Sequence, residues 1–277
     1  MYARRPQPQI VMRRDVPRST PAVNLLQFAV GGRVLPPLAS WTRLTSRFRG
    51  CVLKTIAVHL TGDEKASFVR LGVEQRVRFG LLSGKAENNS PLKGHRHVSF
   101  WLLPDKAGRP SRLICYRDAP FSVDEMEYLL LASERPIAWE AGNSDWRLRL
   151  VPLSAETPLP EPILARSADW RTLTPYVPAR HVLARSGKPK PGHSIEEQIA
   201  ADLANAGYTA AVAQIAVERY GWLKVHRSRR ARSAQTNDMK LGYRISFQLA
   251  EPVQGPLALG ACSHFGLGLF VPSGRHD

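Results

Sequence analysis

Two histidines close together in the sequence are the residues of this chain best suited to proton transfer. His95 and His97 lie where a polar loop runs into an apolar segment that reads as a strand. Side chains two apart in a strand share one face, and Arg96 between them would point the other way. Imidazole titrates near neutral pH, so one ring can take a proton while the other gives one. We predict an acid–base pair here, with Lys93 or Arg96 stabilising negative charge. The alternative is a pair of surface histidines at the end of a strand.

The end of the chain is a glycine-rich loop followed by an apolar strand. Gly260, Gly266 and Gly268 lie in this loop, and His264 lies between them. Glycine permits a positive φ and a close approach of another backbone, so amide N–H groups of such a loop can point at a phosphate chain. We expect these four residues to contact an anionic ligand. A glycine-rich bend before a strand, with His264 in the core or at a cap, is the alternative.

The charge balance indicates which kind of anion the protein binds. The chain has 39 Lys and Arg against 23 Asp and Glu, a formal net charge of +16, and such proteins usually bind nucleic acid. The densest cationic run, residues 224–233, contains Lys224, Arg227, Arg229, Arg230 and Arg232, and a smaller basic loop contains Lys188 and Lys190. We expect both segments to contact phosphates, for which arginine offers bidentate geometry. The alternative for the run is a solvated loop.

Other classes of partner and cofactor are disfavoured. No apolar run approaches the roughly 20 residues that span a bilayer, and the N-terminus lacks the apolar segment of a signal peptide. Cys51, Cys115 and Cys262 are scattered and have no C-x-x-C spacing, so we expect neither a disulfide framework nor a zinc site. We predict a cytoplasmic protein without metal, cofactor or membrane partner.

The elements that must position these residues follow a recognisable order in the first half. Apolar periodicity predicts strands over 25–30, 97–103, 111–116 and 146–151, and helices from residue 40, over 63–79 and over 122–133. Apart from the extra helix at 63–79, the order strand, helix, strand, strand, helix, strand is that of a ferredoxin-like unit.

The second half follows a proline-rich connector, residues 157–162, and repeats this plan. We expect a proline-interrupted first strand over 172–183, a helix from Ser194 to Gly207, strands over 210–217 and 243–249, a short helix over 257–262 and a last strand over 269–271. The fold prediction is α+β, with two tandem ferredoxin-like (RRM-like) domains, residues 22–153 and 154–277, after a basic extended arm, residues 1–21.

Tandem ferredoxin-like domains that end in G-x5-G-x-G before the last strand resemble the RAMP superfamily of CRISPR-associated RNA-binding proteins. Residues 94–97, 174–178, 188–192 and 264–270 are similar, more closely, to the repeat-processing half of the fused backbone-and-processing subunit of type I-G effectors. Those fused relatives carry a further N-terminal half, which this chain is too short to contain. We expect that half to be encoded separately, or this chain to be a piece of a longer protein.

The resemblance implies an endoribonuclease that cuts CRISPR precursor RNA within its repeats without a metal and keeps the product. It implies two kinds of partner, the repeat hairpin of CRISPR RNA and other subunits of the effector complex. Relatives often place the catalytic histidine in the first helix, but that helix has no histidine here before His59. His95 and His97 therefore remain the candidates for catalysis.

Two alternatives stay open. A non-catalytic RNA-binding subunit that caps the guide-RNA hairpin would have the same fold and the same basic surface. A two-histidine phosphoesterase is the other, because residues 97–100 match the pattern H-x-[ST]-Φ. The possible second copy of that pattern, residues 226–229, lacks the apolar position.

Overall fold

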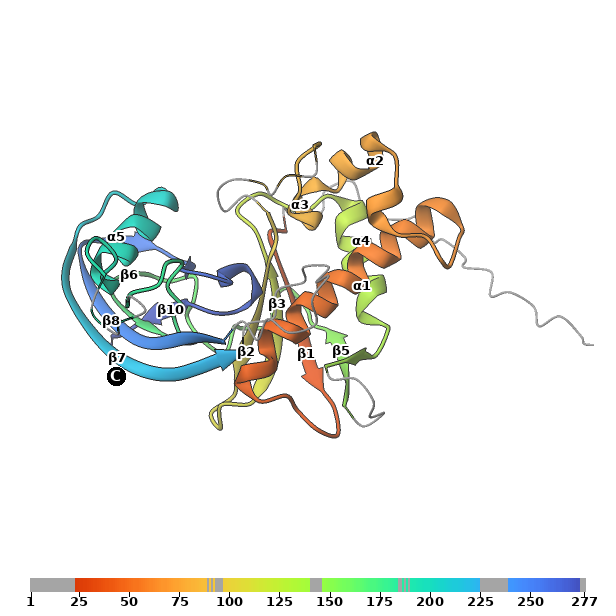
Figure 1. Ribbon diagram of the computed structural model, residues 1–277. Coiled ribbons are helices and arrows are strands. Elements are labelled where there is room, and N and C mark those ends of the chain that lie inside the picture. The colour runs from red at the N-terminus through yellow and green to blue at the C-terminus, as the bar shows by residue number, and fades with distance from the viewer. Residues whose placement is uncertain are drawn as a thin grey trace, which may run out of the picture.

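The computed structural model describes residues 23–88, 90, 92, 97–139, 146–183, 186, 188, 190–224 and 239–274. These residues form two antiparallel sheets of five strands, one from each half of the chain (Figure 1). The α+β class and the tandem ferredoxin-like plan are confirmed. The predicted arm, residues 1–21, lies outside the described residues, and the boundary between residues 153 and 154 stays a prediction.

The first sheet is covered by helices on one face. Its strand order is β2 (Ser99–Pro104), β3 (Pro110–Tyr116), β1 (Leu25–Gly31), β5 (Arg147–Pro152) and β4 (Ile137–Ala138). Helices α1 (Trp41–Thr61) and α4 (Val123–Ser133) pack on it. Phe28, Phe100 and Leu113 of the sheet meet Phe48 and Leu129 of the helices in one apolar core.

Local signals explain where these helices begin and end. The apolar residues of α1 recur at threes and fours, so one face of the helix is buried. Gly62 ends the helix with φ 69°, and its N–H donates to the Val58 carbonyl. Helix α4 starts with a capping box, in which Ser122 and Glu125 each accept a hydrogen bond from the other's backbone N–H.

The single helix predicted over 63–79 is wrong. The chain instead forms η2 (Phe68–Arg70), α2 (Val73–Arg78) and α3 (Gly80–Ser83). A further short helix, η1 (Leu38–Ser40), lies directly before α1. The Asp63 carboxylate accepts from Lys65 N–H at 2.8 Å, a local turn that competes with a helix start. Leu71 and Gly72 then have extended ψ values of 157°, which break the helical backbone.

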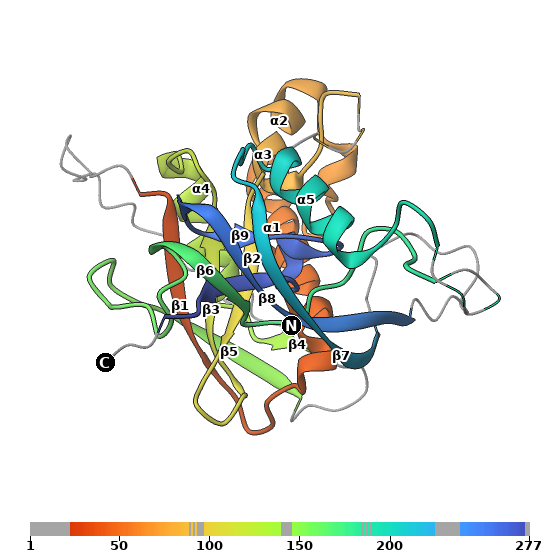
Figure 2. The ribbon, with the colours of Figure 1, turned by 90° about the vertical axis from the view of Figure 1, so that its left-hand side faces the viewer.

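The second sheet repeats the order of the first. It runs β7 (Val212–Lys224), β8 (Met239–Gln254), β6 (Arg166–Thr172), β10 (Leu269–Pro272) and β9 (Leu257–Ala258). Helix α5 (Ile195–Asn205), with the predicted capping box of Ser194 and Glu197, packs on one face. Figure 2 shows β7 and β8 as two long paired strands that cross the molecule.

Two elements of the second half differ from the prediction. The first strand is 166–172 rather than 172–183, because Pro175 and Pro178 have no N–H for a sheet, and Tyr176 forms only an isolated bridge with Tyr243. The helix predicted over 257–262 is replaced by β9 and η3 (Ser263–Phe265). Leu257 and Leu259 are both buried, which is the period of a strand.

The two sheets meet at an apolar seam. Trp101, Leu103 and Ile114, on the face of the first sheet that carries no helix, pack against Leu269 and Val271 of β10. This contact buries the last strand of the chain against β2 and β3. The loop that precedes β10 is thereby held at the seam. None of the described helices is long and apolar enough to cross a membrane.

Candidate active site at the seam between the sheets

The glycine-rich loop is fixed against the first sheet and α1. Trp101 Nε1 donates to the Ser263 carbonyl at 2.9 Å, and Thr45 Oγ1 donates to the Phe265 carbonyl at 2.9 Å. Gly266 has φ 94°, and a Cβ on it would lie 3.4 Å from the Leu102 nitrogen. The loop therefore lies against the backbone of β2, and the positive φ, which other residues rarely adopt, explains glycine at this position.

The expectation that the amides of this loop face a phosphate chain is wrong for Gly266 and Gly268. Gly266 N–H donates to the Ser263 carbonyl at 3.3 Å, and Gly268 N–H donates to the Pro175 carbonyl at 2.9 Å. At Gly260 a Cβ would lie 2.5 Å from the Val177 oxygen. Close packing against backbone oxygens explains Gly260 and Gly268, the positive φ explains Gly266, and the N–H groups of Gly266 and Gly268 are used internally. RNA binding by the three glycines stays a prediction. For Gly266 and Gly268 such binding cannot use the backbone N–H groups, because these already donate within the protein.

The loop brings His264 onto His97. The two ring centroids are 3.7 Å apart, with the planes tilted by 42°. His264 comes from η3, and His97 lies just before β2, so each half of the chain supplies one ring. Both residues are half-buried. A pair of imidazoles at a seam between two domains is an arrangement that can exchange protons with one substrate.

Neighbouring groups orient both rings. His97 Nδ1 lies 3.3 Å from the Val98 carbonyl. A carbonyl only accepts, so Nδ1 carries the hydrogen and Nε2 of the neutral ring carries the lone pair. His264 Nδ1 lies 3.1 Å from Ser99 Oγ, a hydroxyl that either donates or accepts. Ser99 can thus hold His264 in its neutral or its protonated form.

A half-buried cation, Arg49, lies next to the pair. A Cβ on Gly84 would lie 3.4 Å from Arg49 Nη2 and 3.7 Å from His97 Nδ1, so both side chains border the same glycine. The Arg49 guanidinium donates to the carbonyls of Leu82 and Ser83 and has its centre 5.8 Å from the Phe265 ring. Burial lowers the pKa of Arg49, but a guanidinium stays charged at neutral pH.

Three of the residues predicted for catalysis or charge stabilisation, Lys93, His95 and Arg96, lie outside the described residues. The pairing of His95 with His97 therefore stays a prediction. The His97–His264 pair and the position of Arg49 were missed by sequence reasoning. No local signal joins them, because the contact arises from the packing of the glycine loop on β2.

The basic residues predicted to bind phosphate lie in an exposed loop, at the end of a strand or outside the described residues. Lys188 and Lys190 are exposed in the loop before α5. Lys224 ends β7, where its backbone pairs with Met239. Arg227, Arg229, Arg230 and Arg232 lie outside the described residues, as does the second candidate phosphoesterase motif, 226–229. In the part of the chain that is described, no three His, Cys, Asp or Glu side chains gather as metal ligands would.

No known family model matches this chain, and no curated protein matches it. Its arrangement is similar to solved structures of CRISPR proteins. A CRISPR-associated Cas6 protein has 12% identity and a TM-score of 0.43, over 90% of this chain and 98% of that one. Csf5, a type IV Cas6 crRNA endonuclease, has 12% identity and a TM-score of 0.41, over 91% and 99%. CRISPR endoribonuclease Cse3 bound to a 19-nucleotide RNA has 13% identity and a TM-score of 0.35, over 91% and 100%. These similarities are too distant to assign a role to any residue here.

Proposed function

We propose that this chain is a metal-independent endoribonuclease that cuts CRISPR precursor RNA within its repeats, with His97 and His264 as the acid–base pair. The observation that carries the proposal is the 3.7 Å contact of the two rings at the seam. The net charge of +16 favours an RNA substrate. The resemblance of residues 94–97, 174–178, 188–192 and 264–270 to the repeat-processing half of type I-G subunits supports the choice of CRISPR RNA.

The reaction needs only the substrate's own nucleophile. His97 takes the proton of the 2′-OH through its Nε2 lone pair, and the 2′ oxygen attacks the neighbouring phosphorus. The bond from phosphorus to the 5′ oxygen breaks, and His264 gives that oxygen a proton. The products are a 2′,3′-cyclic phosphate and a 5′-hydroxyl, and one proton has in effect passed through the substrate from the acid His264 to the base His97.

The contacts of each ring suit these roles. The Val98 carbonyl fixes His97 with its lone pair on Nε2, which is the form of a base. Ser99 Oγ can accept from the Nδ1–H of a protonated His264, which is the form of an acid. The mechanism needs one neutral ring and one protonated ring, which avoids the repulsion that two positive rings at this separation would have. Arg49 adds positive charge near the phosphorane.

The bound product is the second part of the proposal. The exposed Lys188 and Lys190 and the run 224–233 hold phosphates of the repeat hairpin, so the cut RNA stays on the protein. Other subunits of a CRISPR effector complex then assemble on the retained guide RNA. The alternative, a non-catalytic subunit with the same basic surface, binds the same hairpin and leaves it intact.

The test is a labelled repeat RNA incubated with the pure protein in EDTA. The proposal expects one cut in the repeat, a 2′,3′-cyclic phosphate at the new end, and no cut when the scissile nucleotide is 2′-deoxy. Tight binding with intact RNA in EDTA and in Mg²⁺ supports the non-catalytic subunit. Cleavage that requires Mg²⁺ contradicts the mechanism.

A further inference from the structure

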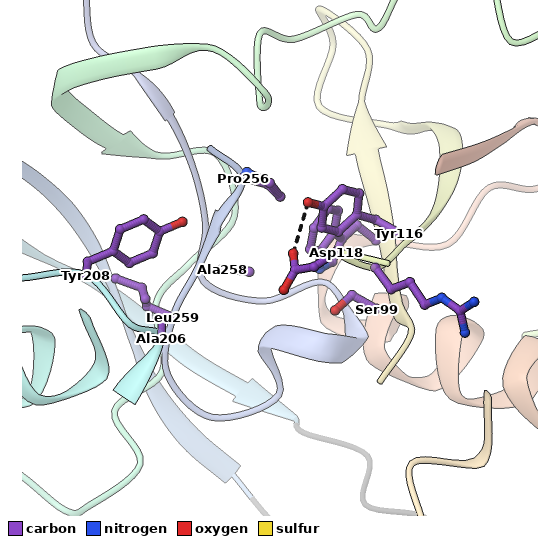
Figure 3. Close-up of a pocket in the computed structure, with 10 residues that line it drawn as sticks. Ser99, Tyr116, Asp118, Ala206, Tyr208, Pro256, Ala258 and Leu259 are labelled. Atoms are coloured by element: carbon purple, nitrogen blue, oxygen red, sulfur yellow. Dashed lines mark hydrogen bonds between the residues drawn. The ribbon is translucent and has the colours of Figure 1, made fainter. Parts of the chain in front are cut away.

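A small pocket opens at the seam (Figure 3), and one of its lining residues, Ser99, also contacts His264. Ser99, Tyr116 and Asp118 line it from the first half of the chain, and Tyr208 and Ala258 line it from the second. Its volume is about 60 Å³, well below the roughly 300–1,000 Å³ of pockets that enclose a whole ligand. Such a pocket takes one edge of a flat ring rather than a whole nucleotide.

An exposed carboxylate, that of Asp118, lines this pocket. Asp118 Oδ1 accepts a hydrogen bond from the Tyr116 hydroxyl at 3.1 Å. The neighbouring cation is already committed, because Arg117 donates to both oxygens of the buried Glu125 at 2.8 Å. Within the described residues Asp118 forms no salt bridge. Each carboxylate oxygen has two lone pairs, so Asp118 can still accept from a ligand.

Aromatic rings stand beside the carboxylate. Tyr116 stacks on Trp101, with centroids 5.3 Å apart and planes 20° apart. In Figure 3 the Tyr208 hydroxyl points across the pocket toward Tyr116 and Asp118. Burial, together with the charge of Asp118, raises the pKa of Tyr116 and of Tyr208. Both hydroxyls therefore stay protonated and neutral beside the carboxylate.

A negative group at the seam of a protein with net charge +16 does not attract phosphate. It suits an N–H donor, and single-stranded bases are read in this way, by hydrogen bonds to their edges between aromatic side chains. Guanine presents two neighbouring donors, N1–H and N2–H, which match the two oxygens of one carboxylate. Adenine, cytosine and uracil present no such pair on that edge.

We infer that this pocket binds an unpaired guanine of the RNA, with Asp118 accepting its N1–H and N2–H. Ser99 belongs both to the pocket and to the contact with His264, so the guanine lies close to the cleaved phosphate. The inference rests on the proposed function, because it places RNA at the seam. It adds the nucleotide that sets the position of the cut.

The test is a titration of the wild-type protein with GMP, IMP, AMP and CMP, followed by NMR chemical shifts. The four ligands carry the same phosphate, so general attraction to the basic surface cancels. A bidentate contact discriminates by about 5- to 150-fold, and GMP should bind more tightly than AMP or CMP by a factor in that range. IMP lacks the 2-amino group and should bind more weakly than GMP.

Asp118→Asn is the matched variant. The amide keeps an oxygen for the Tyr116 hydroxyl but replaces one acceptor by a donor, so the preference for GMP should disappear. Glu127→Gln removes the same charge from an exposed position of α4, on the helix side of the first sheet, and should leave the preference unchanged.

Equal affinity for the four nucleotides, or a GMP preference that persists in Asp118→Asn, would overturn the inference. The two proposals can fail separately. Cleavage of repeat RNA with no GMP preference leaves the nuclease and removes the guanine pocket. A GMP preference lost in Asp118→Asn, without cleavage of any RNA, keeps the pocket and removes the nuclease.

Discussion

Replacing Gly268 by alanine tests how the glycine-rich loop holds His264 at the seam. Its φ is 61°, and a Cβ on it would lie 1.9 Å from the Leu259 carbonyl oxygen, where real contacts stay above 3.0 Å. Gly268→Ala therefore forces the backbone apart by about 1 Å. The left-handed conformation costs about 1–2 kcal/mol and overpacking about 1–3 kcal/mol. We expect the free energy of unfolding to fall by about 2–5 kcal/mol.

The same displacement should impair cleavage. A misplacement of about 1 Å can cost about 10²-fold in rate, so the folded fraction of Gly268→Ala should cut repeat RNA about 10²-fold more slowly. Gly62→Ala is the control, because Gly62 has a similar φ of 69° and nothing within 4 Å of the added Cβ. Urea unfolding and single-turnover cleavage measure the two effects. Equal stability and equal rates in the two variants would refute the packing argument.

Three further outcomes are expected. Glu125→Gln leaves the buried Arg117 without its carboxylate, so urea unfolding should show that the free energy of unfolding falls by about 3–5 kcal/mol. A fall below about 1 kcal/mol would count against the ion pair. Ser99→Ala removes the hydroxyl at His264 Nδ1, so single-turnover cleavage should slow by up to about tenfold. The pH–rate profile should also change, and Ser99→Thr should restore it. An unaltered profile in Ser99→Ala would show that Ser99 does not orient the ring. RNA affinity should fall by orders of magnitude between about 50 and about 200 mM salt if about 6–10 phosphates are contacted, whereas a flat response in filter binding would exclude the phosphate contacts.

Local signals in the sequence predicted much of the fold. The capping boxes at Ser122 and Ser194 and the apolar stripe of α1 act within a turn or two of helix, so their outcome depends little on distant residues. The helix over 63–79 failed because the turn at Asp63 and the extended backbone at Gly72 outweigh the helical pattern.

The site was harder to predict because it is made by packing between the two halves. His97 and His264 are each ordinary in their own segment, and only the close fit of the glycine loop on β2 brings them together. The glycine pattern was visible in the sequence, but it reads the same for phosphate binding and for tight packing. At Gly266 and Gly268 the amides donate within the protein, which favours tight packing.

The most direct test of the account is a double-mutant cycle on His97 and His264 in single-turnover cleavage of repeat RNA. If His97 and His264 act as one acid–base pair, replacing either by alanine should lower the cleavage rate by about 10²–10⁴-fold. The double variant should then be little slower than the slower single variant. His59→Ala, which changes a histidine that packs on Tyr128 near the far end of α1, should keep the wild-type rate. Full cleavage by either single variant, or losses that multiply in the double variant, would contradict a shared acid–base pair.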